Sequence, residues 1–347
     1  MIRLVTRTFL LSAILFFISV DLLTGQNNTG QMKLPEMYYG DTSRTGRPFS
    51  KDPHVIWFRD RYLMYFSIPP GRIAGSVSTG WNIGIAESND LIHWVKKGEI
   101  NPVGEFEKNG LCAPSALVLE NTVHLFYQTY GNGAKDAICH AFSDDGISFK
   151  RNDTNPVFRP TGDWTSGRAI DAEIVKDDNR FLLYYATRDP DMKIQLIGVA
   201  SAPLKTDFRR SDWTQLTDGP VLKPEFPWEE TCTEGASVIR INGWYYMFYA
   251  GAYNNRPQQI GLARSRDGVK WNKISNKPFL QNGDPGTWNS SESGHPHIFM
   301  DRDGRTWLFF QGNNDSGKTW YLSKIEILWN EDGPFIKPSA DTGSAGK

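Results

Sequence analysis

Five stretches of the chain share one pattern, in which a polar residue or a proline stands directly before an apolar, strand-like run. The stretches read KDPHVIWF, CAPSALVL, AIDAEIVKD, TEGASVIR and SGHPHIFMD. With Asp52, Pro114, Asp171, Glu234 and His295 as anchors, the pattern recurs about every 60 residues. A recurrence of this length indicates one supersecondary unit copied five times.

A second apolar and aromatic strand follows each stretch, at residues 61–67, 122–130, 180–188, 243–251 and 305–312. Three units then share a hairpin signature, in which Asp or Asp-Gly supplies the turn and an aromatic residue falls on the next strand. The three signatures run from Ser88 to Trp94, from Ser143 to Phe149 and from Ser265 to Trp271. The third unit has a degenerate version at 207–213, and the fifth lacks it. The sequence therefore predicts an all-β fold, a five-bladed β-propeller over residues 37–335.

The composition narrows the range of partners. The 347 residues are 39% hydrophobic and 22% charged, which is enough to bury one large core. A net charge of −1 argues against nucleic acid or an anionic membrane as the main partner. Aromatic residues make up 13% of the chain. They suit both the packing between propeller blades and the stacking of sugar rings.

The N-terminus has the pattern of an export signal. Residues 1–25 begin with Arg3 and Arg7 and continue into an apolar run that Asp21 interrupts, which is short for a membrane span. We expect a cleaved secretory signal peptide, with an uncleaved membrane anchor as the alternative. The mature protein would then be periplasmic or extracellular, with no membrane contact. We expect a flexible lead-in at residues 26–36 and a flexible tail at 336–347.

Cysteine usage and short motifs exclude several functions. The three cysteines, Cys112, Cys139 and Cys232, cannot form a complete disulfide framework, and we expect buried thiols. The chain has no CxxC pair, GxSxG or HExxH motif. Serine-hydrolase and zinc-protease chemistry therefore have no support.

Three of the five anchors are carboxylates, namely Asp52, Asp171 and Glu234. The innermost strands of a propeller line a central channel, so we expect these side chains to converge on one funnel. Hydrolysis of a glycosidic bond needs one carboxylate to activate water and one carboxylic acid to protonate the leaving oxygen. A third acidic group near that acid would raise its pKa and keep it protonated.

The same residues carry a resemblance to a known family. The chain has KDPHV at 51–55, ID at 170–171 and EGA at 234–236, and the first and last of these precede the aromatic runs YLMY and GWYY. Together these motifs resemble glycoside hydrolase family 43. The resemblance implies Asp52 as general base, Asp171 as pKa modulator and Glu234 as general acid. It also implies an inverting reaction on α-L-arabinofuranosides or β-D-xylosides of plant or algal polysaccharides.

The resemblance also assigns a role to the fifth anchor. His295 matches the histidine that this family places at the channel floor, often beside calcium or its waters. It implies that His295 contacts the sugar and, through water, a metal ion. We expect Cys112, Pro114 and Trp228 to contact the substrate too, and His297 to pack in the core. The chemistry requires no cofactor, and calcium in the central channel is the ion that the resemblance suggests.

Two alternatives remain open. A propeller family that cleaves anhydrogalactose units from agar fragments also has a fifth-blade Ser-Gly-His, and its histidine is a candidate acid. A non-catalytic, sugar-binding propeller is the second alternative, although this chain keeps all three carboxylates. In each case the expected partner is an oligosaccharide or polysaccharide.

One further motif resembles the retaining, fructan-cleaving relatives. Arg188-Asp189-Pro190 matches their RDP signature. It follows a strand instead of opening one, and the chain lacks their Asn-Asp-Pro-Asn opening. We therefore interpret it as a loop turn.

Overall fold

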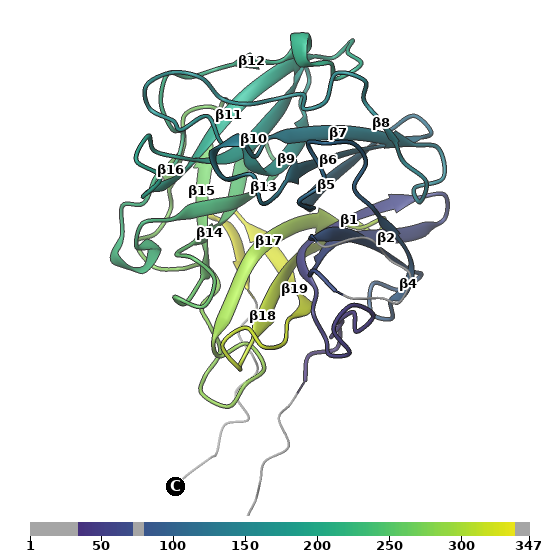
Figure 1. The fold of residues 1–347 in the computed structure, drawn as a ribbon. Helices are drawn as coiled ribbons and strands as arrows, with labels where there is room; N and C mark the ends of the chain where they lie inside the picture. Colours follow the sequence, from purple (N-terminus) through teal and green to yellow (C-terminus); the bar gives the residue numbers. More distant parts are fainter. Residues whose placement is uncertain (1–33, 72–79, 337–347) are drawn as a thin grey trace, which may run out of the picture. The chain divides into compact units, whose positions relative to one another are not determined.

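The computed structural model describes residues 34–71 and 80–336, which form five four-stranded antiparallel sheets (Figure 1). The first strand of each sheet contacts the first strand of the next, and the fifth contacts the first. This closed ring confirms the predicted five-bladed β-propeller. The predicted signal peptide, the lead-in up to residue 33 and the tail from residue 337 lie outside the described residues.

Within each blade the strands follow one another from the channel outward. Blade 1 contains β1 (Lys51–Phe58), β2 (Arg61–Ile68), β3 (Asn82–Ser88) and β4 (Val95–Ile100). Blade 2 contains β5 (Leu111–Leu119), β6 (Thr122–Thr129), β7 (Ile138–Ser143) and β8 (Lys150–Arg151). Blade 3 contains β9 (Ile170–Lys176), β10 (Arg180–Arg188), β11 (Gln195–Pro203) and β12 (Thr214–Gln215). Blade 4 contains β13 (Thr233–Ile241), β14 (Trp244–Gly251), β15 (Gln259–Ser265) and β16 (Asn272–Lys273). Blade 5 contains β17 (Glu292–Met300), β18 (Thr306–Asn313), β19 (Tyr321–Asn330) and β20 (Gly333–Ile336).

Three short 3-10 helices complete the described structure: η1 (Gly133–Lys135), η2 (Arg210–Asp212) and η3 (Pro227–Glu229). Within residues 34–71 and 80–336, no helix has the length and apolar character needed to cross a membrane.

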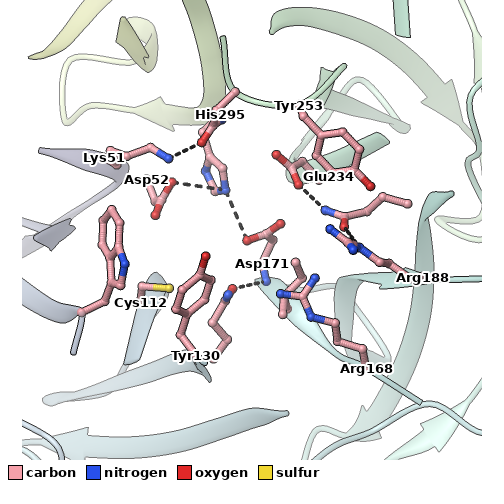
Figure 2. Close-up of a pocket in the computed structure, with 15 residues that line it drawn as sticks. Lys51, Asp52, Cys112, Tyr130, Arg168, Asp171, Arg188, Glu234, Tyr253 and His295 are labelled. Atoms are coloured by element: carbon pink, nitrogen blue, oxygen red, sulfur yellow. Dashed lines mark hydrogen bonds and ion pairs between the residues drawn. The ribbon is translucent and has the colours of Figure 1, made fainter. Parts of the chain in front are cut away.

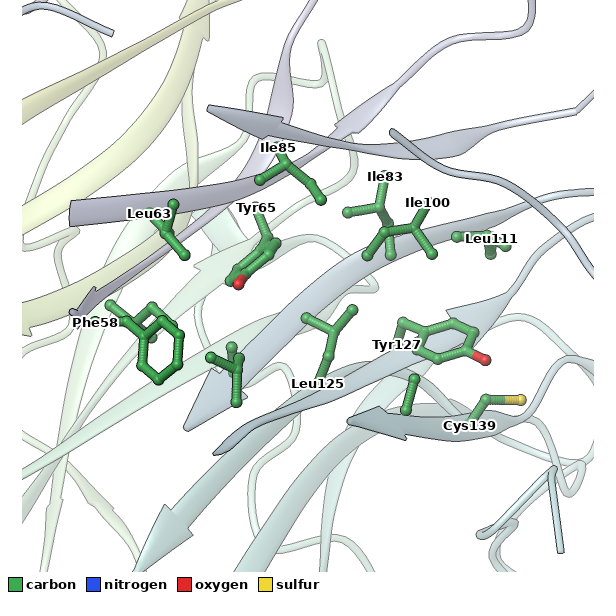
Figure 3. Packing of buried hydrophobic residues seen from close by; sticks show 14 residues of the cluster. Phe58, Leu63, Tyr65, Ile83, Ile85, Ile100, Leu111, Leu125, Tyr127 and Cys139 are labelled. Atoms are coloured by element: carbon green, nitrogen blue, oxygen red, sulfur yellow. The ribbon is translucent and has the colours of Figure 1, made fainter. Parts of the chain in front are cut away.

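Apolar side chains fill the spaces between neighbouring blades. Figure 3 shows one such cluster, where Leu63 and Ile85 of blade 1 pack with Leu125 and Cys139 of blade 2. Burial of this kind is the main favourable contribution to folding. All three cysteines are buried and unpaired, as predicted.

A β-bulge interrupts the innermost strand of every blade at one repeated position. Two residues of the first strand there oppose one residue of the second strand. The first residue of each bulge has a φ between 45° and 55°, and these five residues are Asp52, Ala113, Asp171, Gly235 and His295.

This repeat corrects two of the predicted anchors. Asp52, Asp171 and His295 do occupy equivalent positions, but Pro114 and Glu234 lie one residue away from Ala113 and Gly235, which are the true equivalents. The pattern was misread there because alanine and glycine have no polar side chain to mark the position.

The residue opposite each bulge is aromatic: Phe66, Tyr127, Tyr185, Tyr249 and Phe310. The third strand presents a small residue to this ring, as Gly198 does to Tyr185. A β-carbon at Gly198 would lie 2.5 Å from the Tyr185 ring, so no side chain fits there. This pairing explains why an aromatic residue recurs on the second strand of every blade.

Five hydrogen bonds, one at each junction between blades, link the innermost strands into a ring. They come from the side chain two residues after each bulge residue, and we call His54, Ser115, Glu173, Ser237 and His297 the channel ring. All five are buried. Each reaches the backbone of the next blade, at the Ala116 carbonyl (2.8 Å), the Ile174 amide (3.1 Å), the Val238 amide (2.9 Å), the Ile298 amide (3.0 Å) and the Val55 carbonyl (3.1 Å), respectively.

The hairpin signature lies between the third and fourth strands of its blade, as predicted. In blade 4 the Ser265 hydroxyl accepts hydrogen bonds from the amides of Asp267 and Gly268, and Asp267 accepts two further amides. The equivalent serines of blades 1 and 2 make the same bonds. Each signature therefore folds locally, through side-chain bonds to the turn backbone.

The segment before β1 adds to the last blade. Tyr39 and Leu322 of β19 exchange two backbone hydrogen bonds, of 3.0 and 2.7 Å. The Ser323 hydroxyl also donates to the Met37 carbonyl at 2.8 Å. The N-terminal end of the domain is thereby fixed beside its last blade.

The channel ring generates a stability prediction. The Ser237 hydroxyl accepts from the Ile298 amide and donates to Glu173, so Ser237→Ala leaves a buried amide and a carboxylate oxygen without this partner. We expect a loss of about 1–3 kcal/mol in the free energy of unfolding, measured by chemical denaturation. Ser275→Ala, at an exposed position, is the control and should change it by less than about 0.5 kcal/mol. Equal values for the two variants would contradict the role of the ring.

Candidate active site

A pocket of about 260 Å³ opens where the five innermost strands begin. Every blade contributes to its lining: Asp52, Cys112, Asp171, Glu234 and His295 come from blades 1 to 5 in turn. Figure 2 shows these side chains facing a common space. The repeated bulge accounts for this convergence, because it places the same part of each strand at the channel mouth.

His295 lies between two of the carboxylates. Its Nε2 is 3.6 Å from Asp52 Oδ1 and 3.4 Å from Asp171 Oδ1. Burial alone would lower the pKa of His295, but the charges of Asp52 and Asp171 and the hydrogen bond to Asp171 raise it to about 9. The imidazole is therefore a cation at neutral pH.

Glu234 is a buried carboxyl group held by two amides. Gln258 donates to its Oε1 at 2.7 Å, and Gln195 donates to its Oε2. Burial, and next the charge of Asp171, raise the pKa of Glu234 to about 7. A carboxyl group with this pKa keeps its proton over part of the neutral range, as a general acid must.

The backbone at Asp52 and Asp171 is held in an unusual conformation. Their φ angles are 51° and 52°, values that residues other than glycine adopt at a cost. The Asp52 amide donates to Gln311 at 3.0 Å, and the Asp171 amide donates to Gln128 at 2.7 Å. Each glutamine belongs to the preceding blade in the ring, so contacts between blades hold both carboxylates in place.

Two of the predicted sugar-binding residues lie outside the pocket lining. Cys112 lines the pocket, but Pro114 and Trp228 do not. Trp228, in η3, stacks on Tyr249 with ring centroids 6.0 Å apart and covers Gly251, where a β-carbon would lie 2.3 Å from the indole. Its contacts are those of a packing residue between strands.

The lining also contains residues that the sequence reasoning missed. Lys51 precedes Asp52 on β1, Arg168 precedes β9, Arg188 ends β10, and Tyr253 follows β14. One of them, Arg188, is the first residue of the RDP motif. Asp189 does form a turn, accepting the amides of Lys193 and Ile194 as predicted, but Arg188 lines the pocket.

Calcium in the central channel stays a prediction. A protonated imidazole has no lone pair for a metal ion, so His295 would contact calcium only through water, and calcium prefers six to eight oxygen ligands. Within the channel ring, His54, Glu173 and His297 place possible ligand atoms within 4.8 Å of one another. That set offers two nitrogens and one carboxylate, which is not the oxygen-rich set of calcium. We assign no chemical step to a metal ion.

The arrangement has the parts needed for acid–base hydrolysis. Glu234 can donate a proton, and Asp52 is a carboxylate in the same pocket that can accept one from water. Asp171 raises the pKa of Glu234 and interacts with His295. The three carboxylates and the histidine therefore form one electrostatic unit.

Solved structures share the fold. The chain is similar to the crystal structure of a thermostable family-43 glycoside hydrolase, with 21% identity and a TM-score of 0.67 over 89% of this chain and 98% of that one. It is also similar to an endo-1,4-beta-xylanase from Bacteroides thetaiotaomicron, with 22% identity and a TM-score of 0.66 over 84% of this chain and 94% of that one.

Sequence comparison adds a curated relative and a family. A 1,2-beta-oligomannan phosphorylase from Thermoanaerobacter sp. (strain X514) is 26% identical over 207 residues, or 56% of this chain. The match spans 64% of that relative's length. The sequence model of glycosyl hydrolases family 43 matches residues 45–335, which include all twenty strands except the last residue of β20. The chain therefore belongs to glycosyl hydrolases family 43.

Proposed function

We propose that this protein is a glycoside hydrolase that removes a terminal or side-chain sugar, of the α-L-arabinofuranoside or β-D-xyloside type, from a plant or algal polysaccharide with inversion. The observation that carries the proposal is a buried Glu234 with a pKa of about 7 in the same pocket as Asp52. The matched xylanase structure supports the sugar class only by analogy. The predicted signal peptide at residues 1–25 would export the enzyme to the periplasm or the medium.

The proposed reaction is a single displacement. Asp52 takes a proton from water as the water oxygen attacks the anomeric carbon. The glycosidic bond breaks, and Glu234 gives its proton to the leaving oxygen. Asp171 keeps the pKa of Glu234 high and, with Asp52, holds the His295 imidazolium.

The size of the pocket supports removal of single sugar units. Its volume of about 260 Å³ lies just below the roughly 300–1,000 Å³ of most small-molecule sites. A space of this size accommodates a terminal sugar better than the middle of a long chain, so the pocket favours exo action.

His295 is a second candidate for the general acid. With a pKa of about 9 it carries a proton that could be donated, as in the anhydrogalactose-cleaving alternative. We favour Glu234 because the two carboxylates beside His295 stabilise its charged form and oppose the loss of its proton.

Removal of the acid or the base should abolish turnover. Asp52→Asn and Glu234→Gln are nearly isosteric, and we expect each to lower kcat by about 10² to 10⁴-fold on the best substrate. The substrate would come from a screen of aryl α-L-arabinofuranoside, β-D-xyloside and β-D-galactoside with neoagarobiose. Glu331→Gln, at an exposed turn, should leave kcat unchanged. Near wild-type turnover in either pocket variant would refute the role of that residue.

The reactivity of the leaving group distinguishes the two candidate acids. An activated aryl leaving group needs little protonation, so Glu234→Gln should retain far more activity on an activated aryl glycoside than on a natural oligosaccharide. His295→Gln should lose activity on both to a similar extent. The opposite pattern would make His295 the acid and favour the anhydrogalactosidase-like alternative.

The pH profile tests Asp171. Because the acid must carry its proton, activity should fall as the pH rises through about 7, the pKa of Glu234. Asp171→Asn removes a negative charge that raises this pKa, so the basic limb of the profile should move to lower pH. A basic limb that stays in place or moves to higher pH would contradict the assignment.

A further inference from the structure

Two arginines, Arg168 and Arg188, line the pocket. Arg168 is buried, and among the described residues its one carboxylate contact is Asp136, at 3.5 Å. Its buried Nε makes no hydrogen bond with any of the described residues. Burial raises the pKa of Asp136, and the charge of Arg168 opposes that rise. The 3.5 Å contact is longer than the roughly 2.7–2.9 Å of a close charge-assisted hydrogen bond.

Arg188 is held by neutral groups. Its Nε donates to Gln195 Oε1 at 3.0 Å, its Nη1 donates to the Met192 carbonyl at 3.3 Å, and its guanidinium lies 5.4 Å from the centre of the Tyr253 ring. Among residues 34–71 and 80–336, no carboxylate lies within ion-pair distance of Arg188. These contacts orient the guanidinium but leave its charge unbalanced.

The other pocket cations already have acidic neighbours. His295 interacts with Asp52 and Asp171. Burial alone would lower the pKa of Lys51, but Asp52 and Glu292 raise it above its ordinary value. The lining contains four cationic and three acidic side chains, and Asp136 and Glu292 interact with Arg168 and Lys51 from outside the lining. Arg188 is therefore the guanidinium of the pocket that has no acidic partner among the described residues.

Both arginines line the pocket, and in the view of Figure 2 both lie below Tyr253. Burial raises the pKa of Tyr253, and the charges of Arg188 and Arg168 oppose that rise. Guanidinium groups bind carboxylate and phosphate oxygens through pairs of N–H donors, and a site with two of them is suited to an oxyanion.

We infer that Arg168 and Arg188 form an oxyanion subsite, which takes either the carboxylate of an acidic sugar unit in the substrate or inorganic phosphate. The inference rests on the proposed function in one respect, namely that the substrate occupies this pocket. It extends that function by selecting acidic over neutral glycans.

Binding, rather than turnover, is the appropriate readout, because Arg188 also contacts Glu234 through Gln195. Isothermal titration calorimetry at pH 6 and low salt would compare D-glucuronic acid with D-glucose, D-galacturonic acid with D-galactose, and phosphate with chloride. The proteins would be the wild type, Arg168→Gln, Arg188→Gln, Arg188→Lys and the control Arg240→Gln. Arg240 is exposed and pairs with the exposed Asp178.

We expect at least one anionic ligand to bind the wild type about tenfold or more tightly than its neutral partner. Each Arg→Gln variant should reduce that preference about tenfold, Arg188→Lys should restore part of it, and Arg240→Gln should leave it unchanged. Preference for a uronic acid identifies a substrate carboxylate, and binding of phosphate alone identifies the free anion. Melting temperatures within a few degrees of wild type would show that the variants are folded.

Two outcomes would overturn the inference: equal binding of anionic and neutral ligands to the wild type, or a preference that survives both Arg→Gln variants. The proposed function fails separately, because it depends on the loss of turnover in Asp52→Asn and Glu234→Gln on neutral aryl glycosides.

Discussion

The channel ring is the constraint on which the rest of the structure depends. In each blade one side chain, two residues after the bulge, bonds to the backbone of the next blade, and the fifth bond returns to the first blade. These bonds act together with the apolar side chains that pack between neighbouring blades. Buried hydrogen bonds of this kind are costly to leave unmade, so they favour one arrangement over nearby ones.

The active site is the next layer along the same strands. Once the ring sets the positions of the innermost strands, the bulges fix which side chains face the pocket. Glutamines of the neighbouring blades hold the strained backbone at Asp52 and Asp171. The carboxylates and the imidazolium then determine one another's protonation. Burial makes Glu234 a weak acid, Asp171 strengthens that effect, and the charge of His295 limits it. The repeated backbone geometry of the propeller thus places these groups close enough together to shift one another's pKa values.

The sequence predicted what repeats and missed what does not. The blade number, the second strands and the convergence of Asp52, Asp171 and Glu234 followed from periodicity, because each blade obeys the same packing rules. Glu234 was placed one residue out of phase, since Gly235 at the equivalent position carries no chemical signal. Arg168 and Arg188 were not predicted to line the pocket. One lies in a connection between blades and the other at the end of a strand, and the repeat does not show where side chains at these positions point. Trp228 was expected near sugar, but a lone aromatic residue gives no indication of whether it packs on a strand or on a ligand.

The central claim is that Asp52 and Glu234 flank one glycosidic bond as base and acid. A crystal structure of Glu234→Gln with a bound oligosaccharide tests it most directly. We predict that the scissile oxygen lies within hydrogen-bond reach of the side chain at position 234 and that a water lies between Asp52 and the anomeric carbon. The side-chain groups at positions 52 and 234 should be roughly 6.5–9.5 Å apart. A separation of roughly 5–5.5 Å with no room for water, or a sugar whose scissile oxygen lies against His295 instead, would contradict it.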